Sequence, residues 1–170
     1  MAPRGADERS LVAGARRGDE AAFEALFRLH WPRAYRAAWL VVHDAAAAED
    51  IAQESFLAAL RALDRFDRSR PFGPWLHRIV VNRAIDWARA RSLRGEVELA
   101  VEPGAEPTAN GFDRTLVEAL RGLPPDQRAA VVLRHLLGYT PSQIARMLDV
   151  PRGTVNSRLR RGLDAMRAQL

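Results

Sequence analysis

The sequence predicts an all-α protein in which an acidic linker joins two small helical domains. Three observations support this prediction. Apolar residues recur at helical spacing on both sides of residues 96–111, the only β-type alternation is a short one at 97–101, and proline or glycine separates the helical stretches. Hydrophobic residues make up 48% and charged residues 28% of the 170 residues, which is the balance of a globular protein rather than of a disordered chain.

Residues 10–95 form the first predicted domain. Asp19 is a suitable N-cap for a helix that runs to Pro32, because its carboxylate can accept hydrogen bonds from the free N–H groups of a first turn. A second helical pattern runs from Tyr35 to about His43. Two further helices are expected at residues 47–63, which are rich in Ala and Leu, and at residues 75–91, with Pro74 in the first turn.

The linker and the second domain follow from the distribution of charge. Residues 10–95 hold 14 arginines and ten acidic residues, whereas residues 96–111 hold four acidic residues and no arginine. Prolines and glycines interrupt this acidic segment, which predicts a flexible linker, either simply solvated or lying extended in a basic channel of a partner. Residues 112–170 hold ten arginines and five acidic residues, with helices predicted at 112–121, 125–137, 141–148 and 151–169.

Composition and motif content exclude several classes of protein. The chain has no cysteine, which rules out disulfides, thiolate metal sites and a cysteine nucleophile. Its four histidines are scattered, and it contains no P-loop, dinucleotide fingerprint or nucleophile elbow, so we expect no cofactor, no metal and no catalytic site. The first ten residues lack the apolar core of a signal peptide, and the longest apolar run, 37–42, is too short to cross a membrane. We therefore expect a soluble intracellular protein without membrane insertion.

The clearest functional signal lies in residues 140–166. Two short helices are separated there by a turn at Asp149–Val150, and their apolar residues have the spacing of a helix-turn-helix core. One face of the second helix is apolar, and the opposite face carries side chains that can bind base edges and phosphates, namely Asn156, Ser157, Arg160 and Arg161. This division predicts a DNA-recognition helix, and the alternative is a solvated arginine-rich face.

A second candidate surface mixes aromatic and basic side chains before and within the helix expected at 75–91. Aromatic rings interleaved with guanidinium groups supply the stacking and phosphate neutralisation that single-stranded DNA needs. The rings belong to Phe66, Phe72 and Trp75, the nearby arginines are Arg65, Arg68 and Arg70, and a polar stripe continues through Arg78, Asn82, Asp86 and Arg89. The alternative is that the aromatic rings fill a small core.

A third candidate surface is the acidic face of the helix expected at 47–63. Asp50, Gln53, Glu54 and Leu57 share this face, on the side opposite Phe56. Acidic residues around an exposed leucine are typical of a docking site for a basic protein surface, and the alternative is a solvated charged face.

These motifs resemble those of sigma-70 family RNA polymerase sigma factors. Residues 49–57 are similar to region 2.2, residues 74–94 to regions 2.3 and 2.4, residues 123–128 to the opening of region 4.1, and residues 144–145 and 153–158 to region 4.2. The match covers nearly the whole chain in the family's order. Because only domains 2 and 4 and a short linker are present, the chain resembles the extracytoplasmic-function group.

The resemblance implies a role for each segment. Residues 10–95 would be sigma domain 2, residues 96–111 a linker toward the RNA exit path, and residues 112–170 sigma domain 4. Domain 2 would dock on core polymerase and capture a flipped base of the minus-10 element, and domain 4 would read the minus-35 element. The implied contacts are Glu49, Asp50, Gln53, Glu54 and Leu57 for core polymerase; Arg68, Arg70, Phe72, Trp75, Arg78, Asn82, Asp86 and Arg89 for minus-10; and Thr154, Asn156, Ser157, Arg158, Arg160 and Arg161 for minus-35.

The implied partners are core RNA polymerase, through its beta-prime and beta subunits, promoter DNA and an anti-sigma factor, in the bacterial cytoplasm. The chain itself would catalyse no reaction. Two departures from the family pattern stand out, because residues 71–74 are rich in proline and Asp149 occupies a position where many helix-turn-helix motifs have glycine. The rival interpretations are a helix-turn-helix regulator that acts without being a polymerase subunit, a protein–protein adaptor and a hydrolase or nuclease.

Overall fold

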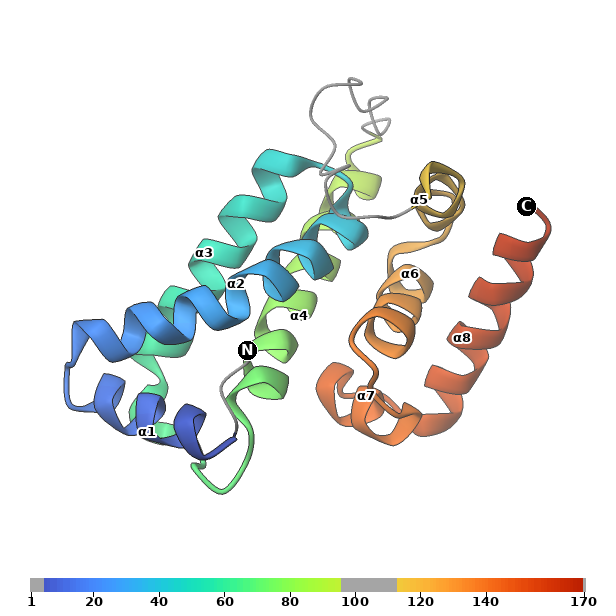
Figure 1. Ribbon diagram of the computed structural model, residues 1–170. Coiled ribbons are helices and arrows are strands. Elements are labelled where there is room, and N and C mark those ends of the chain that lie inside the picture. Colours follow the sequence, from blue (N-terminus) through green and yellow to red (C-terminus); the bar gives the residue numbers. More distant parts are fainter. Residues whose placement is uncertain (1–4, 96–112, 170) are drawn as a thin grey trace.

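The computed structural model describes residues 5–95 and 113–169, with side chains from residue 8 onward. All regular secondary structure in these ranges is helical, so the predicted all-α class is confirmed (Figure 1). The predicted linker 96–111, including the alternation at 97–101, and Phe112 lie outside the described residues. The helices are α1 (Gly5–Arg16), α2 (Glu20–Val42), α3 (Ala45–Arg61), α4 (Phe72–Leu93), α5 (Arg114–Arg121), α6 (Pro125–Val131), α7 (Pro141–Leu148) and α8 (Arg152–Arg167), with a 3-10 turn at Leu63–Arg65 and a π-helical turn at Val132–Leu136.

The N-terminal half is built around α2, which packs against α1, α3 and α4. A single helix of 23 residues runs through Pro32, so the two separate helical stretches expected on either side of this proline are wrong. Pro32 lies on the exposed side of the helix. It has no backbone N–H, so the backbone carbonyl four residues earlier loses its partner in the helix and can bind water instead. Buried residues on both sides of it, Leu26 and Ala34 among them, keep the helix in place through packing.

Side-chain caps fix where the helices of this half begin. Asp19 is the N-cap of α2, as predicted, and its carboxylate accepts hydrogen bonds from the backbone N–H groups of Ala21 and Ala22. Asp44 caps α3 in the same way by accepting from the N–H of Ala47 at 2.9 Å. Between them His43 ends α2 with a left-handed backbone (φ 51°), which turns the chain into α3.

The C-terminal half contains the predicted helix-turn-helix. α7 opens with a capping box, in which Thr140 and Gln143 exchange side-chain to backbone hydrogen bonds. Asp149 ends α7 with φ 53°, and α8 then packs on α6 and α7. At Gly162 a Cβ atom would lie 3.1 Å from Val131 Cγ2, so the missing side chain lets α8 approach α6 closely.

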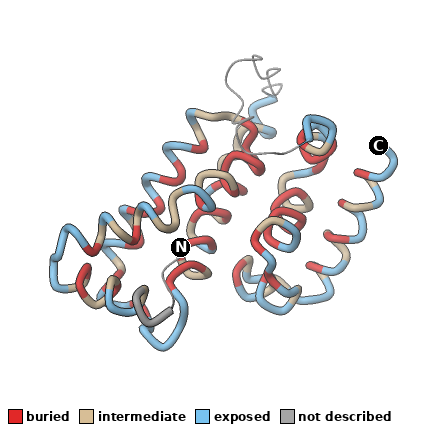
Figure 2. The backbone as a smooth tube through the Cα atoms, viewed as in Figure 1, coloured by how far each residue is buried: buried red, intermediate tan, exposed pale blue. Residues whose placement is uncertain are grey.

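The two halves pack against each other. α2 and α4 face α5, α6 and α7 along the middle of the molecule, where buried residues from both halves gather (Figures 1 and 2). Arg128 of α6 is 3% exposed and donates from Nη1 to the backbone carbonyl of Val41 in α2. Tyr139 and Met147 contact His77 and Asn82, which places α7 and the turn before it beside the first half of α4, where the aromatic and basic residues of the second candidate surface lie.

Candidate nucleic-acid and partner-binding surfaces

The recognition helix α8 divides into a packed face and an open face. Val155, Leu159 and Met166 are buried against the rest of the C-terminal half. Asn156, Arg160 and Arg161 are exposed, and Thr154 and Ser157 are half-buried beside them. Within the described residues, neither Arg160 nor Arg161 forms an ion pair, so both guanidinium groups can bind phosphate oxygens or guanine edges.

Arg158 is placed differently from the other candidate minus-35 residues. Its side chain is only 21% exposed, and Nη2 lies 3.6 Å from Oδ1 of Asp126 in α6. The same carboxylate accepts a hydrogen bond from Arg89 of α4. One acidic side chain therefore joins two arginines that the sequence assigned to different DNA elements, and it ties α4 to the C-terminal half.

The aromatic cluster at the start of α4 is partly core and partly surface. Phe66 and Phe72 are 7% and 3% exposed, and Phe72 packs against the ring of His30 at 5.2 Å. The expectation that Phe72 offers its ring to a DNA base does not fit this burial, because the ring already packs against those of Phe66 and Trp75. Trp75 is half-buried and rests on Phe66 with ring centroids 4.6 Å apart, which leaves it as the available aromatic surface beside the exposed Arg68 and Arg70.

The polar stripe of α4 is partly engaged by the C-terminal half. Arg78 and Asp86 are exposed. Asn82 is half-buried, and its Nδ2 donates to the carbonyl of Arg78 at 2.8 Å and to that of Met147 in α7 at 2.9 Å. In this arrangement both amide hydrogens of Asn82 are used within the protein, so this side chain cannot donate to a DNA base until α7 moves away.

The acidic face of α3 is open to solvent. Glu49, Asp50, Gln53 and Glu54 are exposed, and Leu57 among them is 47% exposed. Gln53 donates to Glu49 at 3.2 Å, and Glu54 pairs with Arg83 of α4 at 3.1 Å across largely exposed side chains. Asp50 has no ion-pair partner in the described part of the chain and remains available to a basic partner.

Two buried histidines lie where the halves meet. His77 of α4 is 3% exposed, and its Nδ1 lies 2.6 Å from the hydroxyl of Tyr139 in the C-terminal half. Burial lowers the pKa of His77 to about 3 and raises the pKa of Tyr139 to about 12. Burial, reinforced by the charges of Arg128 and Arg121, lowers the pKa of His43 to about 2. Both imidazoles are therefore neutral at physiological pH and suited to a buried interface.

The chain matches two family regions, in the order in which the two halves occur. Residues 26–94 match sigma-70 region 2, and residues 113–166 match sigma-70 region 4. Over 162 residues the chain is 40% identical to the ECF RNA polymerase sigma factor SigM of Mycobacterium tuberculosis, with 92% of this chain and 83% of that protein covered. The chain belongs to the extracytoplasmic-function sigma factors of the sigma-70 family. Such a factor serves transcription initiation by RNA polymerase and is not itself an enzyme.

Other relatives agree with this assignment. The ECF sigma factor SigW of Bacillus subtilis is 30% identical, with 94% of each chain covered. The structure of CnrH in complex with the cytosolic domain of CnrY is similar with a TM-score of 0.68 and 27% identity, covering 95% of this chain and 96% of CnrH. The sigma factor RpoE of Bartonella quintana, solved with the anti-sigma factor NepR, shares the fold with a TM-score of 0.71 at 23% identity, over 86% of this chain and 95% of RpoE.

Three residues that organise this sigma factor were not singled out by sequence patterns. Asp126, Arg128 and Tyr139 bridge the two halves, but each lies in a helix or turn where its type carries no special spacing. Asp126 and Arg128 stand in the stretch similar to region 4.1, and this similarity was the signal that the sequence offered for them. No helix of the described residues has the length and apolar character needed to cross a membrane, and these residues contain no cluster of three side chains suited to a metal ion.

Proposed function

We propose that this sigma factor directs RNA polymerase to promoters by reading minus-35 duplex DNA with α8 and minus-10 single-stranded DNA with the first half of α4. The observation that carries the proposal is the open face of α8, where Asn156, Arg160 and Arg161 stand opposite the buried Val155 and Leu159. Residues 10–95 serve as domain 2, residues 96–111 as the linker and residues 112–170 as domain 4.

The proposed minus-35 contacts follow from the chemistry of the α8 face. Arginine can donate two hydrogen bonds to guanine, asparagine can pair with adenine, and Thr154 and Ser157 can donate to phosphates. Arg158 belongs to this set only when its contact with Asp126 is released, since that contact holds it against α6. Each well-placed bidentate pair contributes about 1–3 kcal/mol of discrimination between bases.

The proposed minus-10 contacts combine one ring with several polar groups. Trp75 offers a stacking surface, and Arg68, Arg70, Arg78 and Arg89 neutralise phosphates. Asn82 and Asp86 can hydrogen-bond to a base that has left the stack, so the binding energy offsets the cost of unpairing it. Because Asn82 donates to the Met147 carbonyl and Arg89 to Asp126, the two domains must separate before this surface is complete.

The proposed partners follow from the acidic face of α3. Glu49, Asp50, Gln53, Glu54 and Leu57 form the docking surface for the beta-prime subunit of core polymerase, and the domain 4 side of the chain meets the beta subunit. CnrH and RpoE are held by CnrY and by the anti-sigma factor NepR in their structures, and we propose an anti-sigma partner for this chain as well. Its place of action is the bacterial cytoplasm.

Run-off transcription with core RNA polymerase and a genomic promoter library tests the proposal. Specific starts that share two spaced upstream motifs are expected only when the sigma factor is present. In footprints of the reconstituted holoenzyme, Arg161→Ala should weaken minus-35 protection by about 1–3 kcal/mol, whereas Arg167→Ala, an exposed arginine at the far end of the same helix, should not. Specific DNA binding without polymerase, and no initiation with it, would instead identify an ordinary helix-turn-helix regulator.

A further inference from the structure

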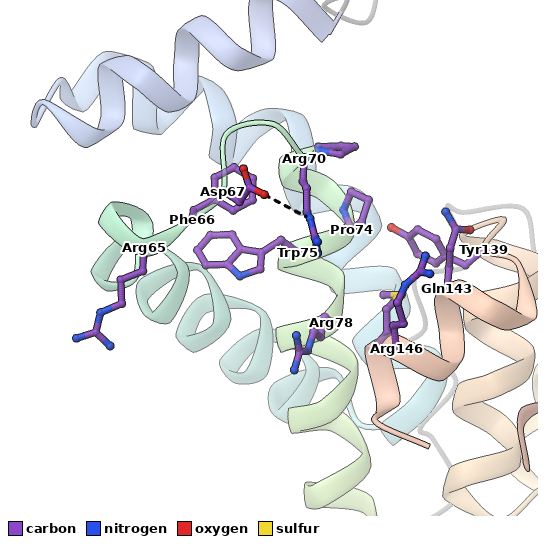
Figure 3. A pocket seen from close by; sticks show the side chains of 12 residues that line it. Arg65, Phe66, Asp67, Arg70, Pro74, Trp75, Arg78, Tyr139, Gln143 and Arg146 are labelled. Carbon is purple, nitrogen blue, oxygen red and sulfur yellow. Dashed lines mark ion pairs between the residues drawn. The ribbon is translucent and has the colours of Figure 1, made fainter. Parts of the chain in front are cut away.

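A cavity of about 660 Å³ opens between the two domains, with walls from both. Arg70, Trp75 and Arg78 line it from the domain 2 side, and Tyr139, Gln143 and Arg146 line it from α7 and the turn before it (Figure 3). This volume lies within the range of about 300–1,000 Å³ that is usual for small-molecule sites. The cavity exists only in the arrangement where domain 4 lies against α4.

The charge on the cavity walls is positive and largely unpaired. Arg78 and Arg146 come from opposite domains, both are exposed, and neither forms an ion pair within the described part of the chain. Among the described residues that line the cavity, the one acidic side chain is Asp67, which is already engaged by Ser69 at 2.7 Å and by Arg70 at 3.5 Å. Guanidinium groups around a cavity whose acidic side chain is already engaged favour an anion with several oxygens, and phosphates fit them best because arginine binds phosphate with two parallel hydrogen bonds.

One wall of the cavity is aromatic. Trp75 packs against Phe66 in a tilted arrangement, with ring centroids 4.6 Å apart and an interplanar angle of 32°, and it is only half-buried. Phe66 and Phe72 support the indole from behind, so its position is fixed by the core. A fixed, partly exposed indole beside arginines is suited to stack on a planar base.

We infer that this cavity binds a free nucleoside polyphosphate, with the base against Trp75 and the phosphates bound by the arginines of both walls, Arg78 and Arg146. The inference rests on the proposed function in one respect, because Trp75 and Arg78 are also proposed minus-10 contacts. A nucleotide in the cavity therefore competes with the minus-10 strand. It also stabilises the packed arrangement of the two domains, since Arg146 belongs to domain 4. At a nucleotide concentration ten times its Kd, the ratio of packed to separated molecules rises about 11-fold.

The binding test uses the full-length protein without polymerase. Calorimetric titrations with GTP, ATP, inorganic tripolyphosphate and a short single-stranded DNA compare the possible ligands. The nucleotides should bind, tripolyphosphate should bind at least 10-fold more weakly, and Arg146→Ala should weaken nucleotide binding at least 10-fold. Arg167→Ala is the matched control, since it removes an exposed arginine of domain 4 far along α8 from the cavity, and it should leave the titration unchanged.

Three results overturn the inference. No heat with either nucleotide shows that the cavity is not a nucleotide site. Equal affinity for tripolyphosphate and the nucleotides shows that the base contributes nothing to binding and that the cavity is only a polyanion site. Nucleotide binding that is unaffected by Arg146→Ala assigns the ligand to the DNA surface of domain 2 alone. None of these results bears on run-off transcription, so failure of the nucleotide site and failure of the proposed function remain distinguishable.

Fluorescence energy transfer tests the effect on domain packing. The chain has no cysteine, so cysteines introduced at Leu93, at the end of α4, and at Ala168, after α8, accept a dye pair without background labelling; both positions are exposed and lie at the same end of the packed molecule (Figure 1). Added GTP should raise the population with high transfer in the labelled protein and should not do so when Arg146→Ala is also present. An unchanged transfer at saturating nucleotide would show that the ligand does not hold the domains together.

Discussion

Arg128 is the residue whose removal should damage domain 4 most. Its side chain is 3% exposed and donates Nε to the carbonyl of Leu120 at 3.0 Å and Nη2 to those of Arg121 and Leu123 at 2.8 and 2.9 Å. Leu120 and Arg121 form the end of α5, where the last carbonyls of a helix lack partners within it. A cation at this end also interacts favourably with the helix dipole. Arg128 thus caps α5 from a neighbouring helix and reaches Val41 of α2 as well.

The cost of Arg128→Ala follows from these contacts. A hydrogen bond from a charged group contributes about 1.5–3 kcal/mol, and a buried carbonyl left without a donor costs about 1–3 kcal/mol. These effects overlap and water reaches part of the site, so the total is on the order of 3–5 kcal/mol, as for other broken buried charge networks. Domain 4, taken as the matched residues 113–166, has a total stability of only ~3–8 kcal/mol at ordinary values per residue. The variant should therefore lose most of the folded population of this domain.

Urea unfolding of the full chain, followed by far-UV circular dichroism, measures this loss. Arg128→Ala should show an early transition, or reduced helix content without urea, that corresponds to α5–α8. The urea midpoint of Arg128→Lys, which keeps the charge and can reach fewer carbonyls, should lie between those of Arg128→Ala and the native chain. Arg134→Ala is the control, because this exposed arginine makes one hydrogen bond, to the Tyr139 carbonyl at 3.2 Å, and should cost less than about 1 kcal/mol. A midpoint for Arg128→Ala within error of that control would refute the reasoning.

Three further predictions follow from the domain interface, a strained turn and the acidic face. His43 and His77 are neutral when buried, so the unfolded chain takes up protons that the native chain does not as the pH falls below 6.5. At about pH 5.5 the two histidines together should lower the free energy of unfolding by on the order of 2–3 kcal/mol. A double variant with leucine at both positions should reduce this pH dependence in urea titrations. Asp149→Gly should raise the unfolding free energy by about 0.5–1 kcal/mol, because φ is 53° there and glycine adopts this conformation without a Cβ clash; an unchanged or lower midpoint would contradict this. Asp50→Ala combined with Glu54→Ala should reduce co-elution with core polymerase, whereas Asp64→Ala, which removes an exposed acid outside α3, should not. Equal co-elution of the native chain, the double variant and the Asp64→Ala control would mean that the acidic face is merely solvated.

Local chemistry predicted most of the helical elements and the recognition helix. Asp19 and the apolar spacing located the start of α2, Thr140 and Pro141 located the start of α7, and the division of α8 into two faces agrees with the burial of Val155 and Leu159. These features depend on residues within one or two turns of each other, so a period of 3.6 residues is enough to reveal them. Pro32 was misjudged because a surface proline can be accommodated when packing on both sides holds the helix.

Sequence patterns were enough to predict the helical class, the helix-turn-helix, the acidic face of α3 and the absence of cysteine chemistry. Long-range packing, which no sequence pattern revealed, buries Phe72 in the core, lets Asp126 join Arg89 to Arg158, and brings Asn82 to the carbonyl of Met147. The Asn82–Met147 contact joins positions 65 apart and the Arg128–Val41 contact positions 87 apart. No local period encodes such pairs, because they exist only when the two halves of the chain pack in one particular way.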